Sequence, residues 1–263
     1  KLKLKMLLIH NINPVMLSIF GINIYWYGFM YLLGFFFIWL YSKVYLKKIN
    51  SFKSNDQFID FLFYCILGVL IGGKLGYAFF YNSSQTLSNP LSILFFWNGG
   101  MSFHGGLIGV IIAIYYYARK IKVTFLTLSD IVCPLVPIGL FTGRIGNFIN
   151  GELWGKPTDQ SWGIIFPHVD NLYRHPTQLY EAILEGILLF IILNLLLRYK
   201  NYSGFISGIF LTFYAIFRSL IEFNRVPDSH IGYLFLDWVT MGQLLCLPML
   251  ILGLFLINYS KKQ

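Results

Sequence analysis

Long apolar stretches separated by short polar linkers dominate the chain. An α-helix rises about 1.5 Å per residue, so roughly 20 apolar residues cross the ~30 Å hydrocarbon core of a bilayer. The pattern predicts about seven transmembrane helices, at about residues 22–42, 58–80, 104–118, 126–148, 178–197, 204–224 and 236–258. We therefore expect an all-α fold, a polytopic membrane helix bundle in which residues 1–263 form a single integral membrane domain.

Two linkers are longer than the others and predict structure outside the membrane core. The first, at about residues 81–103, contains Asn89-Pro90 and then the apolar run Leu91–Trp97. This run is typical of a short amphipathic helix in the membrane interface, with Trp97 as an anchor. The second, at about residues 149–177, mixes glycine, proline, tryptophan and charged residues. We expect the first linker to be an interfacial arm and the second a small external head.

The composition agrees with a membrane location. Hydrophobic residues make up 57% of the chain and charged residues 12%, whereas a soluble domain has about 25% charged residues. So few charges cannot cover a surface in water, which excludes a soluble enzyme, a disordered tail and a fibrous protein. The three cysteines lie inside apolar stretches and no metal-binding spacing occurs. We therefore expect no disulfide, no metal and no cofactor.

Basic residues are concentrated in alternate linkers. The chain has 20 Lys and Arg residues, scattered through short loops, which favours membrane orientation over binding of nucleic acid. The odd-numbered linkers and the C-terminal tail hold 11 of them, and the even-numbered linkers hold 3. Because basic residues favour the cytoplasmic side, we expect an outer N-terminus and a cytoplasmic C-terminus. Lys1–Lys5 opposes this orientation, and we take Met6 as the natural start of the chain.

Ionisable side chains inside the predicted helices are candidates for function, because a charge in the membrane costs at least a few kcal/mol. Arg144 is one of them, and Asn147 lies on the same helical face. Gly143 and Gly146 permit the close approach of a helix or a ligand. The planar guanidinium group suits a phosphate group. The alternative is that Arg144 pairs with a buried carboxylate and only fixes the packing.

A second polar stripe follows the sixth predicted helix, where four side chains share one face: Tyr214, Arg218, Glu222 and Arg225. Arg144 and Arg218 near the outer surface would form a cationic pocket of the size of a phosphate group. Glu222 would keep this pocket from binding anions too tightly. The alternatives are an internal salt bridge between Arg218 and Glu222, and an ordinary interfacial cation at Arg225.

Four further residues stand out in the sequence. His104 follows and precedes glycines in Gly99–Gly106, so it is either a general base near neutral pH or an interfacial histidine. Tyr27 either lines the site or anchors the helix at the interface. Lys74 either contacts a phosphate or extends its ammonium group to the surface. We expect His175, at the start of a helix, to be structural.

Several segments resemble bacterial prolipoprotein diacylglyceryl transferases in their order and spacing. They are Trp26–Gly28, Gly100–Gly106, Gly143–Gly155, Arg174–Glu181, Tyr214–Asp228 and Met241–Gln243. The resemblance implies a seven-helix enzyme of the bacterial inner membrane, surrounded by membrane lipids, with its N-terminus outside. It implies transfer of diacylglycerol from phosphatidylglycerol to the lipobox cysteine of a prolipoprotein signal peptide, with release of glycerol 1-phosphate. Neither a metal nor a nucleotide is expected.

The resemblance also implies roles for individual residues. Arg144 and Arg218 would hold the phosphate, and His104 would be the general base, with Tyr214 as a rival or helper. The other substrate-binding positions would be Tyr27, Asn147, Glu152, Glu222, Gly99 and Gly105. Among these residues, Asn147, Glu152 and Glu222 would orient the two arginines.

A membrane transporter or scramblase for anionic lipids is the main alternative, because intramembrane arginine and glutamate also line substrate pathways. No pair of corresponding broken helices is evident, and the polar residues gather toward the outer side, which disfavours this reading. A non-catalytic lipid-binding scaffold is a second alternative, which needs the arginines but no pairing of His104 with Tyr214. An assay for the thioether product separates the three.

Overall fold

A computed structural model describes residues 8–45, 51–80, 82–94, 101–198, 202–227, 232–236 and 238–262. The chain divides into two compact units, and each is described by itself. The first comprises Lys1–Ser42 and Asp130–Gln263, and the second comprises Lys43–Ser129. The expectations for Lys1–Lys5, Trp97 and Gly99 lie outside the described residues.

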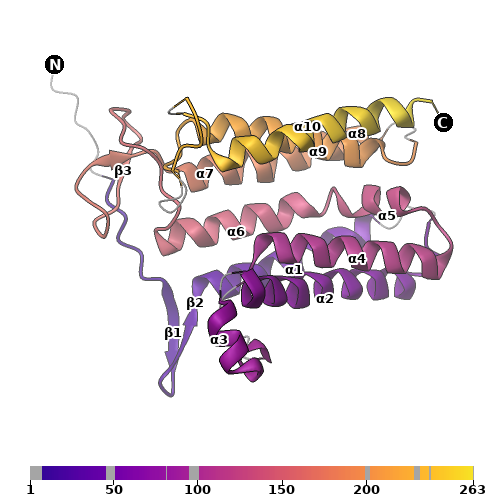
Figure 1. Cartoon of the computed structure of the whole chain (residues 1–263), viewed down its shortest axis with the longest axis horizontal. Helices are drawn as coiled ribbons and strands as arrows, with labels where there is room; N and C mark the ends of the chain where they lie inside the picture. Colours follow the sequence, from indigo (N-terminus) through magenta and orange to yellow (C-terminus); the bar gives the residue numbers. More distant parts are fainter. Residues whose placement is uncertain are drawn as a thin grey trace. The chain divides into compact units, whose positions relative to one another are not determined.

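A helical segment is present at each of the seven predicted places. The helices are α1 (Trp26–Tyr45), α2 (Asn55–Phe80), α4 (Phe103–Ile121), α5 (Phe125–Val132), α6 (Val136–Asn150), α7 (Thr177–Glu181), the π-helix η4 (Ala182–Leu188), α8 (Leu189–Leu196), α9 (Phe205–Glu222) and α10 (Met241–Ser260), as Figure 1 shows. The polytopic helical fold is therefore confirmed.

Among the described helices, the candidate membrane spans number fewer than the predicted seven. Five of the described helices are long and apolar enough to cross a membrane, with α7, η4 and α8 acting as one. A sixth crossing is possible if α5 and α6, which are bent by 44° at their junction, form one span. Pro134 at this junction has no N–H group to continue a helix, which accounts for the break. The remaining helix, α4, contains three tyrosines and ends with Arg119 and Lys120.

Two small antiparallel sheets interrupt the predicted all-α fold. The hairpin β1 (Val15–Ile19) and β2 (Ile22–Tyr25) precedes α1, and β3 (Ile164–Ile165) pairs with β4 (Tyr173–Arg174) in the head. The hairpin turns at Phe20 and Gly21, which both have positive φ, as a tight two-residue turn requires. The first helix consequently begins four residues later than predicted, because a short apolar run does not distinguish a strand from a helix.

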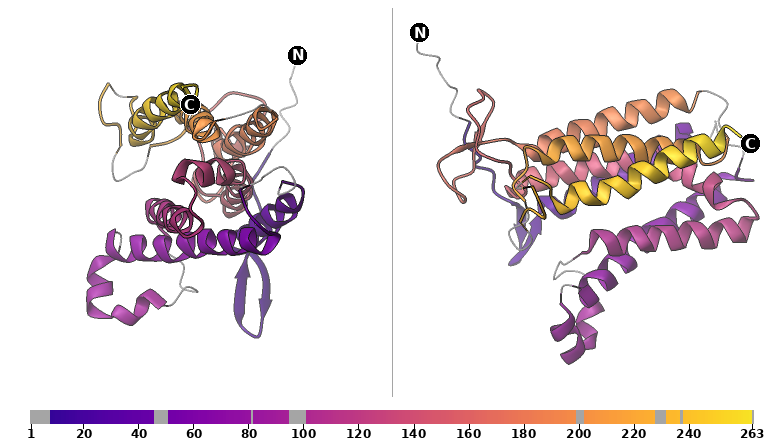
Figure 2. Two further views of the ribbon diagram at one scale, coloured as in Figure 1. Left: turned by 90° about the vertical axis from the view of Figure 1, so that its right-hand side faces the viewer. Right: turned by 45° about the horizontal axis from the view of Figure 1, so that its top comes forward.

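The first unit contains a bundle in which α9 and α10 run side by side and α6 packs on α7 and η4 (Figures 1 and 2). Its apolar core includes six buried residues: Cys133, Leu189, Leu193, Ile206, Ile209 and Phe217. Helix α9 packs closely on α10, since a Cβ atom added to Gly253 would lie 2.8 Å from the carbonyl oxygen of Gly208. The carboxylate of Asp130 accepts hydrogen bonds from the backbone N–H groups of Gly204 and Ser207, both at 2.7 Å, and fixes the start of α9.

The second unit is built on the pair α2 and α4, with the short helices α3 (Ser83–Ser88) and η2 (Pro90–Leu94) between them in sequence. Glycines line the contact, because a Cβ atom on Gly76 would lie 2.7 Å from the Cα atom of Gly105. Lys74 is buried in this unit. In the predicted arm, η2 exposes Leu91 and Leu94, in agreement with an apolar interfacial surface.

Candidate active site

Helix α6 carries the first group of predicted site residues. It begins with a proline in its first turn and ends at Gly151, whose left-handed backbone conformation closes the helix. Arg144 donates a 3.4 Å hydrogen bond to Asn147, and Asn147 donates one of 2.7 Å to the carboxylate of Glu152. The predicted common face of Arg144 and Asn147 is therefore confirmed, and Glu152 joins it from beyond the helix end.

The two glycines that flank Arg144 have different surroundings. A Cβ atom on Gly146 would lie 3.0 Å from the Tyr27 ring, so helix α1 approaches α6 closely there. Nothing lies within 4 Å of the equivalent position on Gly143, among the described residues. The hydroxyl group of Tyr27 is 3.2 Å from that of Tyr31. Tyr27 is thus beside the Arg144 face, and open space remains next to Gly143.

Helix α9 carries the second group. Arg218 donates to Glu222 in the predicted i,i+4 pair, and the other oxygen of Glu222 accepts a 2.8 Å hydrogen bond from the hydroxyl group of Thr240. Tyr214, one turn before Arg218, stacks on Phe210 with a distance of 5.9 Å between the ring centroids. The internal salt bridge considered from the sequence is therefore present.

Two buried glutamates connect the arginines, and sequence reasoning assigned neither of them a role. Glu181, at the end of α7, contacts Arg144 through an ion pair of 3.0 Å between Oε2 and Nε, and accepts a hydrogen bond from Arg218 through Oε1. Glu185, in η4, lies 3.7 Å from Arg144 and 4.0 Å from Arg218. Their i,i+4 spacing inside an otherwise apolar stretch was the signal for a polar face directed at other helices.

Arg225 also belongs to this cluster. Its Nη1 donates a 3.1 Å hydrogen bond to Oε1 of Glu181, and its Nε lies 4.0 Å from Glu222. The residue is only 8% exposed. The interpretation of Arg225 as an ordinary interfacial cation is therefore wrong, because a buried cation needs the carboxylates that it contacts here.

The cluster is balanced in charge, with three arginines and three glutamates among the described residues: Arg144, Arg218, Arg225, Glu181, Glu185 and Glu222. The sequence predicted a pocket with an excess of positive charge, and this prediction is corrected, because the arginines have an equal number of carboxylate partners. The accessible face is nevertheless cationic. The side chains of Arg144 and Arg218 are 19% and 13% exposed, whereas those of Glu181 and Glu185 are fully buried. The accessible part of these ion pairs therefore belongs to the arginine side chains.

The local helix geometry contributes to this arrangement. The segment that carries Glu185 is π-helical. Such segments are rare in proteins, and those that occur are often found at functional sites. A Cβ atom on Gly186 would lie 2.7 Å from Cβ of Phe141, so η4 and α6 are in close contact. This contact brings the backbone of Glu185 near the helix that carries Arg144.

Arg174 holds the external head together, and the head packs next to the cluster. This side chain pairs with Asp170, donates a 3.1 Å hydrogen bond to the carbonyl group of Gly155, and lies 4.6 Å from the ring centroid of Trp154. The hydrogen bond from Arg174 holds the pKa of the Asp170 carboxyl below its usual value. A Cβ atom on Gly155 would lie 2.6 Å from the carbonyl oxygen of Asn224, so the head packs directly against the end of α9.

His104 belongs to the second unit. It is exposed and lies in the first turn of α4, where the hydroxyl group of Ser102 accepts a hydrogen bond from the N–H group of Gly105 as the N-cap. Helix α2 approaches Gly105 closely, since a Cβ atom there would lie 2.8 Å from the Cα atom of Gly76. A contact of Gly105 or Gly99 with substrate stays a prediction.

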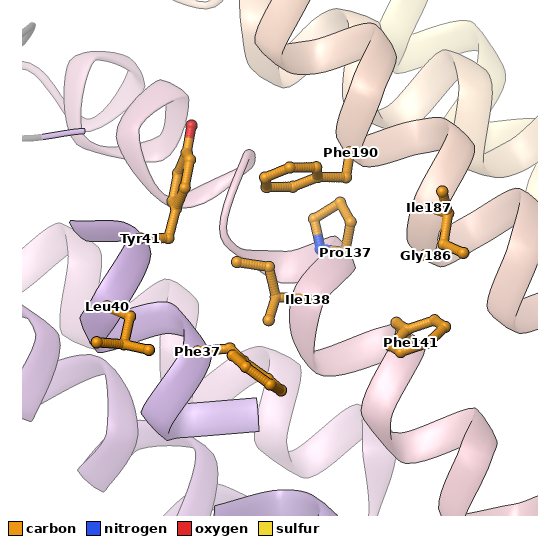
Figure 3. Close-up of a pocket in the computed structure, with 9 residues that line it drawn as sticks. All are labelled: Phe37, Leu40, Tyr41, Pro137, Ile138, Phe141, Gly186, Ile187 and Phe190. Carbon is orange, nitrogen blue, oxygen red and sulfur yellow. The ribbon is translucent and has the colours of Figure 1, made fainter. Parts of the chain in front are cut away.

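An apolar hollow of about 370 Å³ lies in the first unit (Figure 3). Its lining comes from three parts of that unit, with Phe37 and Leu40 on α1, Phe141 on α6, and Phe190 on α8. Gly186 also lines it and is the chain neighbour of Glu185. The hollow therefore reaches the helices that carry the charged cluster.

Comparisons with known proteins agree with this architecture. A model of the prolipoprotein diacylglyceryl transferase family matches residues 14–259. The phosphatidylglycerol–prolipoprotein diacylglyceryl transferase of Pseudomonas savastanoi pv. phaseolicola is 50% identical over 256 residues, covering 96% of this chain and 95% of the relative. The enzyme of the same name from Oleidesulfovibrio alaskensis is 50% identical over 250 residues, covering 95% and 94%. That from Legionella pneumophila strain Corby is 48% identical over 251 residues, covering 95% and 98%.

These matches extend over the helices, the head and the arginine cluster alike. On this evidence, the chain belongs to the prolipoprotein diacylglyceryl transferase family.

Proposed function

We propose that this protein is an enzyme that transfers the diacylglyceryl group of phosphatidylglycerol to the cysteine thiol of a prolipoprotein. The observation that carries the proposal, beside family membership, is the charged cluster of the first unit. The side chains of Arg144 and Arg218 are partly exposed, whereas the side chain of their shared partner Glu181 is fully buried. Such a surface suits a phosphodiester, which is the anionic group that phosphatidylglycerol brings to the reaction.

The reaction requires stabilisation of a leaving phosphate. The thiol sulfur attacks the diacylglycerol carbon that bears the phosphate ester oxygen, a C–S bond forms, and the C–O bond breaks. Glycerol 1-phosphate leaves with the bonding electron pair, and charge grows on its phosphate group. N–H donors that are already in place stabilise this charge without reorganisation. We assign this role to Arg144 and Arg218.

The thiol must lose its proton during the reaction. A free cysteine thiol has a pKa near 8.5, and the thiolate is the reactive form. We propose that His104 accepts this proton, with Tyr214 as the alternative. The proton then passes to the released glycerol phosphate or to water, which restores the base and balances the reaction.

The remaining predicted residues organise the donor site. Asn147 links Arg144 to Glu152 through two hydrogen bonds, and Glu222 contacts Arg218. We propose that these contacts fix the directions of the two guanidinium groups. Tyr27, packed on the same helix at Gly146, shapes the adjacent space.

We propose that part of one acyl chain of the lipid lies in the apolar hollow. Its volume of about 370 Å³ falls within the range of small-ligand pockets, roughly 300–1,000 Å³. It borders α6 and η4, the helices that also carry Arg144 and Glu185. A lipid with its phosphate at the arginines could therefore extend a tail along the same helices.

The orientation in the membrane is also part of the proposal. The basic linkers support a cytoplasmic C-terminus, and within the first unit the head and the end of α10 lie at opposite ends of the bundle (Figure 1). We propose that the head and the charged cluster face the outer side of the bacterial inner membrane. There they would meet prolipoprotein signal peptides after export.

The test is the appearance of both products together. Purified protein in phosphatidylglycerol vesicles would receive a lipobox peptide, with its Cys→Ser variant as the control. The expected result is release of glycerol phosphate in step with thioether formation on the cysteine peptide alone. Lipid movement across the bilayer without either product would contradict the proposal and favour a scramblase.

A further inference from the structure

We propose that Glu181 is a positioning residue that holds the guanidinium groups of Arg144 and Arg218 together as one phosphate-binding pair. The inference rests on the proposed function and assigns the contact on which that function depends. Glu181 is buried at the end of α7 and is distinct from the residues that the sequence resemblance assigns to the site.

The geometry places Glu181 between arginines from different parts of the first unit. Oε2 is 3.0 Å from Nε of Arg144 on α6. Oε1 accepts a hydrogen bond from Arg218 on α9, and a second one of 3.1 Å from Arg225 just beyond α9. One carboxylate therefore joins two helices and the segment that follows α9.

Glu185 provides an internal comparison. It lies one turn further along, is equally buried, and carries the same charge as Glu181. Its carboxylate approaches Arg144 and Arg218 only to 3.7 and 4.0 Å, and neither of its oxygens makes a hydrogen bond in the part of the chain that the structure describes. It supplies negative charge without holding either guanidinium group in a fixed direction.

This difference separates a charge effect from a positioning effect. Neutralising either glutamate leaves one extra positive charge in the cluster, which strengthens the attraction of an anionic lipid. Replacement of Glu181 by glutamine leaves one acceptor oxygen and turns the other into an NH2 group, so the side chain can no longer hold both the ion pair with Arg144 and the hydrogen bond from Arg218. The two like charges are then free to move apart. Binding of phosphatidylglycerol should then persist or tighten, while the alignment needed in the transition state is lost.

The experiment compares E181Q with E185Q in detergent micelles that contain phosphatidylglycerol at varied mole fraction, with a lipobox peptide as acceptor. We expect E181Q to lower kcat by about 10- to 100-fold, the range for loss of one charge-assisted hydrogen bond, with KM for phosphatidylglycerol unchanged or lower. E185Q should lower KM similarly, and its kcat should fall by clearly less than that of E181Q. Equal kcat values for the two variants, or a raised KM in E181Q, would overturn the inference.

A second variant protects the test against loss of folding. E181D retains the charge but withdraws the carboxylate by one methylene group, so kcat should fall while KM stays unchanged. If E181D folds and keeps full kcat, the positioning role is wrong. Failure of the proposed function is recognised separately, because the unsubstituted protein would then form no thioether product.

Discussion

Charged side chains inside this membrane protein are tolerated because they neutralise one another. An isolated charge in hydrocarbon costs several kcal/mol, and removal of one partner from a buried pair leaves that cost uncompensated. Here each arginine of the cluster contacts at least one glutamate, and Glu181 contacts all three arginines. The side chains of Arg144 and Arg218 stay partly exposed while that of Glu181 is buried, and this difference is the basis of the proposed site.

The forked shape of the Arg144 side chain gives the first prediction at this scale. Arg144→Ala should abolish transfer, and Arg144→Lys should lower kcat/KM by about 10- to 100-fold, because an ammonium group cannot replace two directed N–H groups. Turnover of both variants in phosphatidylglycerol micelles checks this. Arg119→Lys, an exposed cation on α4, is the matched control and should be unaffected. A fully active and folded Arg144→Ala protein would remove the phosphate role.

The pH dependence of the head gives the second prediction. Because Arg174 lowers the pKa of Asp170 in the folded protein, this pair stabilises the head fully above about pH 4, the usual value for an aspartate. The stabilisation should disappear as the pH falls through the lowered pKa. Hydrogen exchange in residues 155–174 should therefore accelerate on acidification.

Asp170→Asn is expected to give faster exchange already at neutral pH and a weaker dependence on acid. Asp159→Asn, which changes an exposed carboxylate of the same head, is the control. An unchanged acid profile in Asp170→Asn would show that the pair does not stabilise the head.

At the scale of the elements, the sequence predicted the helices well and the strands poorly. Apolar runs of about 20 residues have few alternatives to a membrane helix, so the last three predicted spans correspond closely to α7–α8, α9 and α10. The hairpin before α1 was missed because Val15–Tyr25 is also apolar, and only Phe20-Gly21 marks the turn. The extent of helix α4 was predicted correctly. Its polar C-terminal end makes it less apolar than the helices that qualify as candidate membrane spans.

The site was predictable in part for a similar reason. Arg144 and Arg218 stand out because each interrupts an apolar helix. Their partners Glu181 and Glu185 lie on another helix, and spacing along the sequence does not reveal which charges meet across helices. A close approach at Gly146 was expected from the glycine, but whether a helix or a ligand makes it depends on packing, and here α1 makes it.

Close packing of α9 on α10 gives a prediction at this scale. Gly253→Ala should destabilise the protein by about 1–3 kcal/mol, as overpacked sites do, because the new Cβ atom would lie 2.5 Å from Oγ1 of Thr212. Gly139→Ala is the same chemical change at a helical position with nothing within 4 Å, so it should be neutral or slightly stabilising. Thermal unfolding in detergent compares the two. Equal melting temperatures would contradict the packing argument.

At the scale of the whole molecule, composition and charge limit the function more than any single motif does. Only 12% of the residues are charged, and six of them meet in the charged cluster of the first unit. Family membership over residues 14–259 connects that cluster to transfer of a lipid group to a protein. The central claim is that this group comes from phosphatidylglycerol.

One measurement tests that claim most directly. Vesicles would contain phosphatidylglycerol with deuterated acyl chains and phosphatidylethanolamine with ordinary chains, and the mass of a lipobox peptide would be followed after addition of the protein. We predict a mass gain equal to one deuterated diacylglyceryl group, on the cysteine peptide and not on its serine variant. A gain that carries the unlabelled chains would contradict phosphatidylglycerol as the donor, and no gain at all from folded protein would contradict the transferase function.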